Sequence, residues 1–175
     1  MLRNAMIVSL VLVLTLSTAF AQTASYKFGP AQQGCSGNPV SFTVRGKPQL
    51  GTTITLGVTM EQNTATHFYL SLIMTGFSDK RWGAIKLPFD SRVLSFFTWT
   101  YQKYWCGLLY VSGDAFTVVP GLKRGPVYVR MPIPNNRALL GLRFYQQVLA
   151  YRRISLPVVL ERFRFSRAGY GVIGT

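Results

Sequence analysis

The chain has 175 residues, which suits a single domain. Lys and Arg number 19 against 5 Asp and Glu, with one His, and the formal net charge is +14. A hydrophobic content of 49% excludes a disordered polar chain. The scarcity of carboxylate and imidazole groups leaves little material for acid–base or metal chemistry.

Residues 1–21 have the pattern of a secretory signal peptide. Arg3 precedes an apolar run over residues 7–16, and small residues lead to Ala21. A basic start, a short apolar run and a small-residue ending are typical of such peptides, and the run is short for a membrane anchor. We expect cleavage near Ala21 and a product that is secreted, periplasmic or at the cell surface. The polar residues 22–34 are expected to form an N-terminal lead-in to a single domain over 35–175.

Export affects the interpretation of the two cysteines, Cys35 and Cys106. Disulfides persist outside the cytoplasm, so an isolated pair predicts one intramolecular bond. Closing a loop of about 70 residues stabilises a fold by about 4 kcal/mol in the chain-entropy model. The alternative, a nucleophilic Cys106, is less favoured because its neighbours are apolar and strand-like and include no His. A zinc site would need two further ligands.

Alternation of apolar and polar residues with a period of two predicts antiparallel strands. In chain order these cover residues 40–45, 53–60, 66–77, 92–101, 107–111, 115–119, 126–133, 158–166 and 169–174. Segment 139–151 is long enough for a helix, and its periodicity does not decide between helix and strand. Evenly spaced Pro and Gly separate the strands. We predict an all-β fold, an antiparallel β-sandwich of jelly-roll or Ig-like type, with about 8–9 strands and one disulfide.

Several short motifs follow one another in order along the chain. They are Gly34-Cys35-Ser36-Gly37, the Gly46–Gly51 segment, a second Cys at mid-chain, Met131-Pro132-Ile133-Pro134, and Gly141-x-x-Phe144-Tyr145-x-Gln147, which is the most specific. In this order they resemble a family of secreted bacterial β-sandwich domains. The resemblance covers residues 34–174 and implies export and a β-sandwich with one disulfide. It carries over no activity. The chain differs from the family in its high positive charge, as in Tyr151-Arg152-Arg153.

Catalytic patterns are weak. The only imidazole, His67, lies in a predicted strand, and no Gly-x-Ser-x-Gly nucleophile motif is present. The carboxylates that a glycosidase pair would need are adequately explained as salt-bridge partners: Glu61, Asp79, Asp90, Asp114 and Glu161. Phosphate-binding, dinucleotide and calcium motifs are missing as well. We therefore expect a non-enzymatic protein with no cofactor and no metal.

Cationic residues are concentrated in the last third of the chain. The candidate polyanion-binding residues are Arg143, Arg152, Arg153, Arg162, Arg164 and Arg167. Guanidinium groups on one face of a strand would bind carboxylate, sulfate or phosphate in bidentate fashion. The expected partner is an acidic polysaccharide or another extracellular polyanion, without sequence-specific recognition of nucleic acid. The alternative is that the cations only keep a secreted β-protein soluble.

An aromatic cluster offers a second function. Trp99, Tyr101, Tyr104 and Trp105 precede Cys106. Exposed rings here would form a sugar-stacking platform and make the protein a carbohydrate-binding module. Packing in the core beside a disulfide is the competing interpretation. The sequence thus favours an extracellular interaction module, with carbohydrate binding as the alternative and a hydrolase far less favoured.

Overall fold

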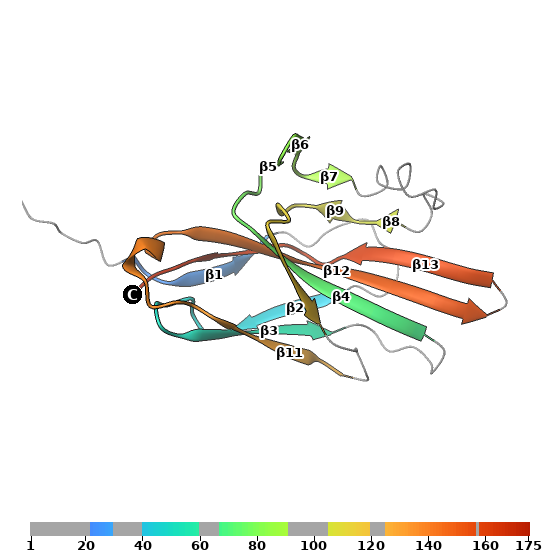
Figure 1. The fold of residues 1–175 in the computed structure, drawn as a ribbon, viewed down its shortest axis with the longest axis horizontal. Coiled ribbons are helices and arrows are strands. Elements are labelled where there is room, and N and C mark those ends of the chain that lie inside the picture. Colours follow the sequence, from blue (N-terminus) through green and yellow to red (C-terminus); the bar gives the residue numbers. More distant parts are fainter. Residues whose placement is uncertain (1–21, 30–39, 60–66, 91–104, 120–124, 157) are drawn as a thin grey trace, which may run out of the picture.

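The computed structural model describes residues 22–29, 40–59, 67–90, 105–119, 125–156 and 158–175; within them, side chains are described except at 67–69, 105–106, 152–156 and 158–162. The described part is all-β, with a single 3-10 turn at Arg137–Leu139 and no α-helix. The prediction of an all-β fold with antiparallel sheets is confirmed. The strands are β1 (Ser25–Phe28), β2 (Ser41–Arg45), β3 (Thr53–Thr59), β4 (His67–Gly76), β5 (Arg81–Trp82), β6 (Ile85–Lys86), β7 (Phe89–Asp90), β8 (Trp105–Cys106), β9 (Leu108–Leu109), β10 (Ala115–Val119), β11 (Val127–Pro132), β12 (Arg143–Leu156), β13 (Val158–Phe165) and β14 (Gly169–Val172) (Figure 1).

The long strand β12 organises a seven-stranded sheet. Along one side it pairs with β4, which in turn pairs with β10; along the other side it pairs first with β14 and then with β13. β13 and β14 are separated by a break at which Ser166 N donates to Val148 O at 2.8 Å and Ser166 Oγ accepts from Val148 N at 2.9 Å. β1 extends the sheet beside β14, and the short β8 runs parallel to β13.

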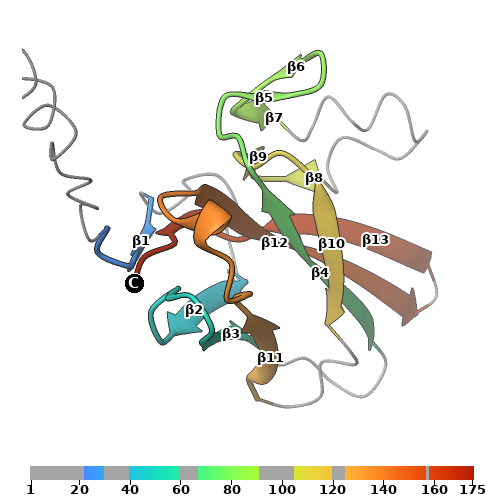
Figure 2. The same cartoon turned by 60° about the vertical axis from the view of Figure 1, so that its left-hand side comes forward.

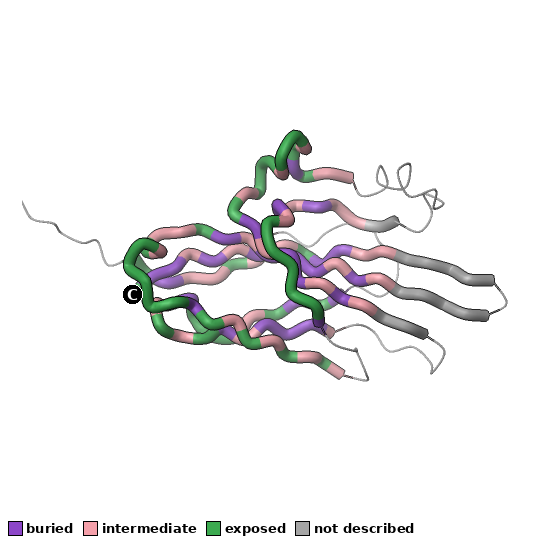
Figure 3. The backbone as a smooth tube through the Cα atoms, viewed as in Figure 1, coloured by how far each residue is buried: buried purple, intermediate pink, exposed green. Residues whose placement is uncertain are grey.

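A three-stranded sheet, β11-β3-β2, lies against one face of the large sheet, here called the inner face (Figure 1). In β3, Ile54, Leu56 and Val58 are buried, because their side chains alternate with those of threonines. They share a core cluster with Phe144 and Val148 of β12. Figure 3 shows buried residues concentrated where the two sheets overlap.

The opposite, outer face of the large sheet is partly covered by the segment between β4 and β10 (Figure 2). This segment contains the paired strands β5–β6 and β7–β9. Leu87 and Leu109 from the segment form a second buried cluster with Met74 and Phe165 of the large sheet. The outer face therefore carries a core of its own near the middle of β12.

Two consecutive buried glutamines connect these layers from opposite faces of β12. Gln146 accepts a hydrogen bond from the Tyr26 hydroxyl at 3.1 Å, and its Nε2 lies 3.2 Å from Thr75 Oγ1 and 3.2 Å from Met131 Sδ of the small sheet, to both of which it donates. Burial raises the pKa of Tyr26 above its ordinary value, which keeps this phenol a donor. Gln147 is fully buried; its Nε2 donates to Leu108 O and Ser166 O, each at 2.8 Å, and its Oε1 accepts from Tyr110 N at 3.0 Å.

The strand positions agree with the alternation pattern in most places, and two differences are informative. Residues 139–151, ambiguous in sequence, form the 3-10 turn and most of β12. β1 lies within the expected lead-in 22–34, where only Tyr26 and Phe28 are large apolar residues. Both pack against the main core cluster. The strand predicted over 92–101 lies outside the described residues.

Candidate polyanion-binding surface

Three of the candidate arginines occupy neighbouring positions on one face of the β12–β13 hairpin. The register pairs Arg152 with Arg162, and Arg164 with Ala150. Directly paired residues of antiparallel strands project to the same side, and so do residues two apart in one strand. We call Arg152, Arg162 and Arg164 the inner arginine set, because Ala150 is buried in the core beneath the small sheet.

The position of the inner arginine set follows from the unequal lengths of the two sheets. β12 has 14 residues, whereas β2, β3 and β11 have between 5 and 7. Figure 1 shows the far ends of β12 and β13 extending past the small sheet. Ala150 is buried where the small sheet overlaps the hairpin, and the register pairs Arg152 with Arg162 farther along the two strands. Arg164, which is half-buried, has an interaction partner within the protein.

The remaining three candidate arginines lie elsewhere. Arg153 pairs in register with Glu161, on the outer face. Arg143 is exposed at the start of β12, with its guanidinium carbon 5.4 Å from the centre of the Tyr170 ring. A side-chain hydrogen bond with Tyr145 raises the pKa of Arg143 above its ordinary value. Arg167, in the break between β13 and β14, stacks over Phe28 at 4.0 Å. The six residues therefore do not form one surface.

The pairing of Arg152 with Arg162 is electrostatically unfavourable by itself. Like charges directly opposite on adjacent strands destabilise a sheet. A bound anion placed between them would remove that repulsion, and planar guanidinium groups match the oxygen geometry of carboxylate, sulfate and phosphate.

The aromatic candidates are less informative. Trp99, Tyr101 and Tyr104 lie outside the described residues. Trp105 begins β8 and pairs in parallel with Phe163. The sequence interpretation of these residues as a sugar-stacking platform stays a prediction.

The predicted disulfide also stays a prediction, because Cys35 lies outside the described residues. Cys106 ends β8, in register with Arg164 of β13. We expect mass spectrometry of the non-reduced, alkylated protein purified from an oxidising compartment to show a linked Cys35–Cys106 peptide and no alkylated thiol. Two alkylated thiols in that material would contradict the pairing.

Three aspartates, Asp114, Asp90 and Asp79, lie in the part of the chain whose side chains the structure describes. Asp114 Oδ2 accepts from Ser112 Oγ and from Phe77 N, both at 2.8 Å, and so fixes the turn before β10. Asp90 lies in β7, and Asp79 is exposed in the connection that follows β4. Across the described ranges, no group of three or more His, Cys, Asp or Glu is placed to hold a metal ion. No helix in the described part is long and apolar enough to span a membrane.

Two apolar features on the outer face were not predicted from the sequence. A hollow of about 340 Å³ is lined by Leu70, Leu72, Leu149, Tyr151 and Phe163. Large hydrophobic side chains are also exposed at Phe77, Phe116 and Val118, and Val118 pairs in register with Leu72 of the hollow. The sequence feature that could have predicted this exposed surface is the run 115–119, which contains no charged residue.

Comparison with known proteins gives no relative for this fold. No family model, no curated protein and no solved structure matches the chain.

Proposed function

We propose that this chain is a non-enzymatic, secreted interaction protein whose β12–β13 hairpin binds extracellular polyanions such as acidic polysaccharide. The observation that carries the proposal is the register of the hairpin, which places Arg152 opposite Arg162 with Arg164 two residues along. The net charge of +14 supports it by attracting any anionic polymer at long range.

We also propose the type of sandwich and the disulfide that the sequence predicts. A β-sandwich of jelly-roll or Ig-like type, closed by a Cys35–Cys106 bond, would hold the hairpin rigidly outside the cell. Two facing sheets with a shared core support the sandwich. The motif resemblance to secreted bacterial β-domains supports export.

Replacing Arg152 and Arg162 together by serine is expected to weaken binding to a fluorescently labelled heparin oligosaccharide by about tenfold or more at low salt. Each arginine contributes charge-assisted hydrogen bonds to the polymer, and the two act on neighbouring anionic groups. Fluorescence anisotropy measures the affinity, and thermal melting verifies that the variant is folded.

The matched control is the double variant Lys47→Ser with Arg137→Ser. Both side chains are exposed and lie away from the hairpin, and the net charge changes by the same amount. We expect this variant to keep most of its affinity. Equal losses in the two double variants would show that heparin senses only the total charge, and would contradict a site on the hairpin.

A further inference from the structure

Among the described residues, the strand β10 forms an edge of the large sheet and carries no charged or proline residue of the kind that usually protects such an edge. Within the described part of the chain it pairs only with β4. Four of its five residues are exposed, including Phe116 at 50% and Val118 at 58%. It contains no charged residue and no proline. Edge strands in soluble proteins normally carry such features, because an open edge is a template for another strand.

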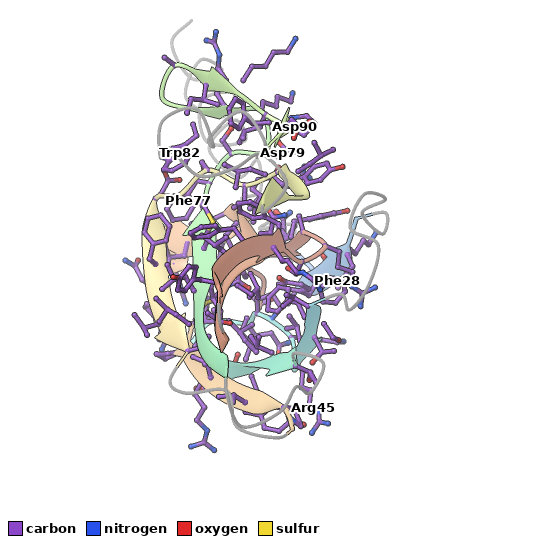
Figure 4. All side chains as sticks on the ribbon, turned by 90° about the vertical axis from the view of Figure 1, so that its right-hand side faces the viewer. Phe28, Arg45, Phe77, Asp79, Trp82 and Asp90 are labelled. Carbon is purple, nitrogen blue, oxygen red and sulfur yellow. The ribbon has the colours of Figure 1, made fainter. Side chains whose placement is uncertain are left out.

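The apolar side chains of this edge gather on the outer face. Phe116 and Val118 pair in register with Met74 and Leu72, whose side chains belong to that face. The rings of Phe116 and Trp82 both lie against Gly113: a β-carbon there would lie 2.8 Å from Phe116 Cζ and 2.9 Å from Trp82 Cζ2. Figure 4 shows Phe77, which is 58% exposed, on the same side of the molecule as Trp82.

The hairpin that carries Trp82 is cationic. Lys80 precedes β5, Arg81 lies in β5 and Lys86 lies in β6, and all three residues are exposed. Asp79 is the exposed acidic residue of this segment, and the carboxylate of Asp114 is engaged by Ser112 and the Phe77 backbone. Positive charge therefore borders the end of β10 at which its exposed phenylalanine lies.

We propose that β10 is a docking site for an extended strand of a partner protein, with apolar side chains at alternate positions and acidic residues beside the β5–β6 hairpin. Main-chain hydrogen bonds to the open edge would supply affinity, and contacts with Phe116 and Val118 would supply specificity. A lipid surface offers no backbone groups to pair with this edge. A second copy of the chain carries the same net charge of +14, which opposes its association with a cationic surface. This site is independent of the arginine hairpin.

The probe is a synthetic peptide of alternating valine and threonine that ends in two glutamates, with a version ending in two lysines as comparison. We expect the glutamate peptide to bind the purified protein at least about tenfold more tightly at low salt. Methylating every second backbone nitrogen should abolish binding for one alternate set of positions and leave it for the other, because only one edge of the peptide faces β10. Binding that ignores both changes would overturn the proposal.

The variant Val118→Lys places a charge on the exposed outer face of the edge and should weaken the glutamate peptide by about tenfold. Leu140→Lys is the matched control, since Leu140 is 38% exposed and lies outside β10. It should bind like the parent. Two results would replace the proposal with another occupant: dimerisation by sedimentation that Val118→Lys removes, or binding to anionic phospholipid vesicles with no binding to either peptide.

Discussion

Replacement of Gln147 by leucine is expected to lower the free energy of unfolding by about 3–5 kcal/mol. The leucine has a similar volume, so the loss does not come from a cavity. It comes from the loss of the three hydrogen bonds that Gln147 makes to the backbone, to Leu108 O, Ser166 O and Tyr110 N, of which the bond to Ser166 O is buried and the other two are partly buried. A buried backbone group costs about 1–3 kcal/mol when left unsatisfied. Urea unfolding followed by tryptophan fluorescence measures the change.

The control is Gln49→Leu. Gln49 Nε2 donates to Thr175 O at 3.0 Å in an exposed setting, where water replaces the lost bond. This variant should lose less than about 1 kcal/mol. Comparable losses for the two variants would mean that Gln147 does not join β12 to the β9 segment as described.

Replacement of Gly76 by alanine should destabilise the protein by about 3 kcal/mol or more. A β-carbon at this position would overlap the carbonyl oxygen and hydroxyl of Ser112 and lie 2.7 Å from its carbonyl carbon. Ser112 cannot move aside easily, because its hydroxyl holds Ser78 N at 3.1 Å and its backbone N donates to Ser78 O at 2.9 Å. Thermal or urea unfolding of the variant tests this.

Gly29→Ala serves as the comparison for Gly76→Ala. There the nearest atom to an added β-carbon is Ala168 O at 3.6 Å, an ordinary van der Waals distance, and the backbone is not in the left-handed region. Alanine also restricts the unfolded chain, which favours folding slightly. A nearly unchanged stability is expected. If Gly76→Ala were equally neutral, the close approach of β4 to the Ser112 turn would be wrong.

Strands with one buried and one solvent-facing side were predictable from sequence alone. β3 and β13 follow from alternation, because burial on a single face imposes a period of two. β12 was ambiguous for a physical reason: Gln146 and Gln147 are polar yet fully buried, so the sequence shows no alternation where they lie. β1 was not predicted because its short sequence has only two large apolar residues, and pairing with β14 stabilises it.

The arginine site was predictable only in part. Alternation alone places Arg162 and Arg164 on the same face of a strand. Which residues of β12 oppose them depends on register, and a shift by one residue would exchange Arg152 for Arg153. The structure pairs Arg152 with Arg162 and Arg153 with Glu161. That distinction separates a like-charge pair from an opposite-charge pair, and the sequence does not contain it.

The salt dependence of heparin binding tests the central claim most directly. For the parent, the logarithm of the association constant should fall steeply and linearly with the logarithm of salt concentration, because each contact with a sulfate or carboxylate group of heparin releases a counterion. The Arg152→Ser, Arg162→Ser variant should lower the magnitude of that slope by about two contacts, while the Lys47→Ser, Arg137→Ser variant should leave it unchanged. The same slope in the parent and the hairpin variant would contradict polyanion binding at Arg152 and Arg162.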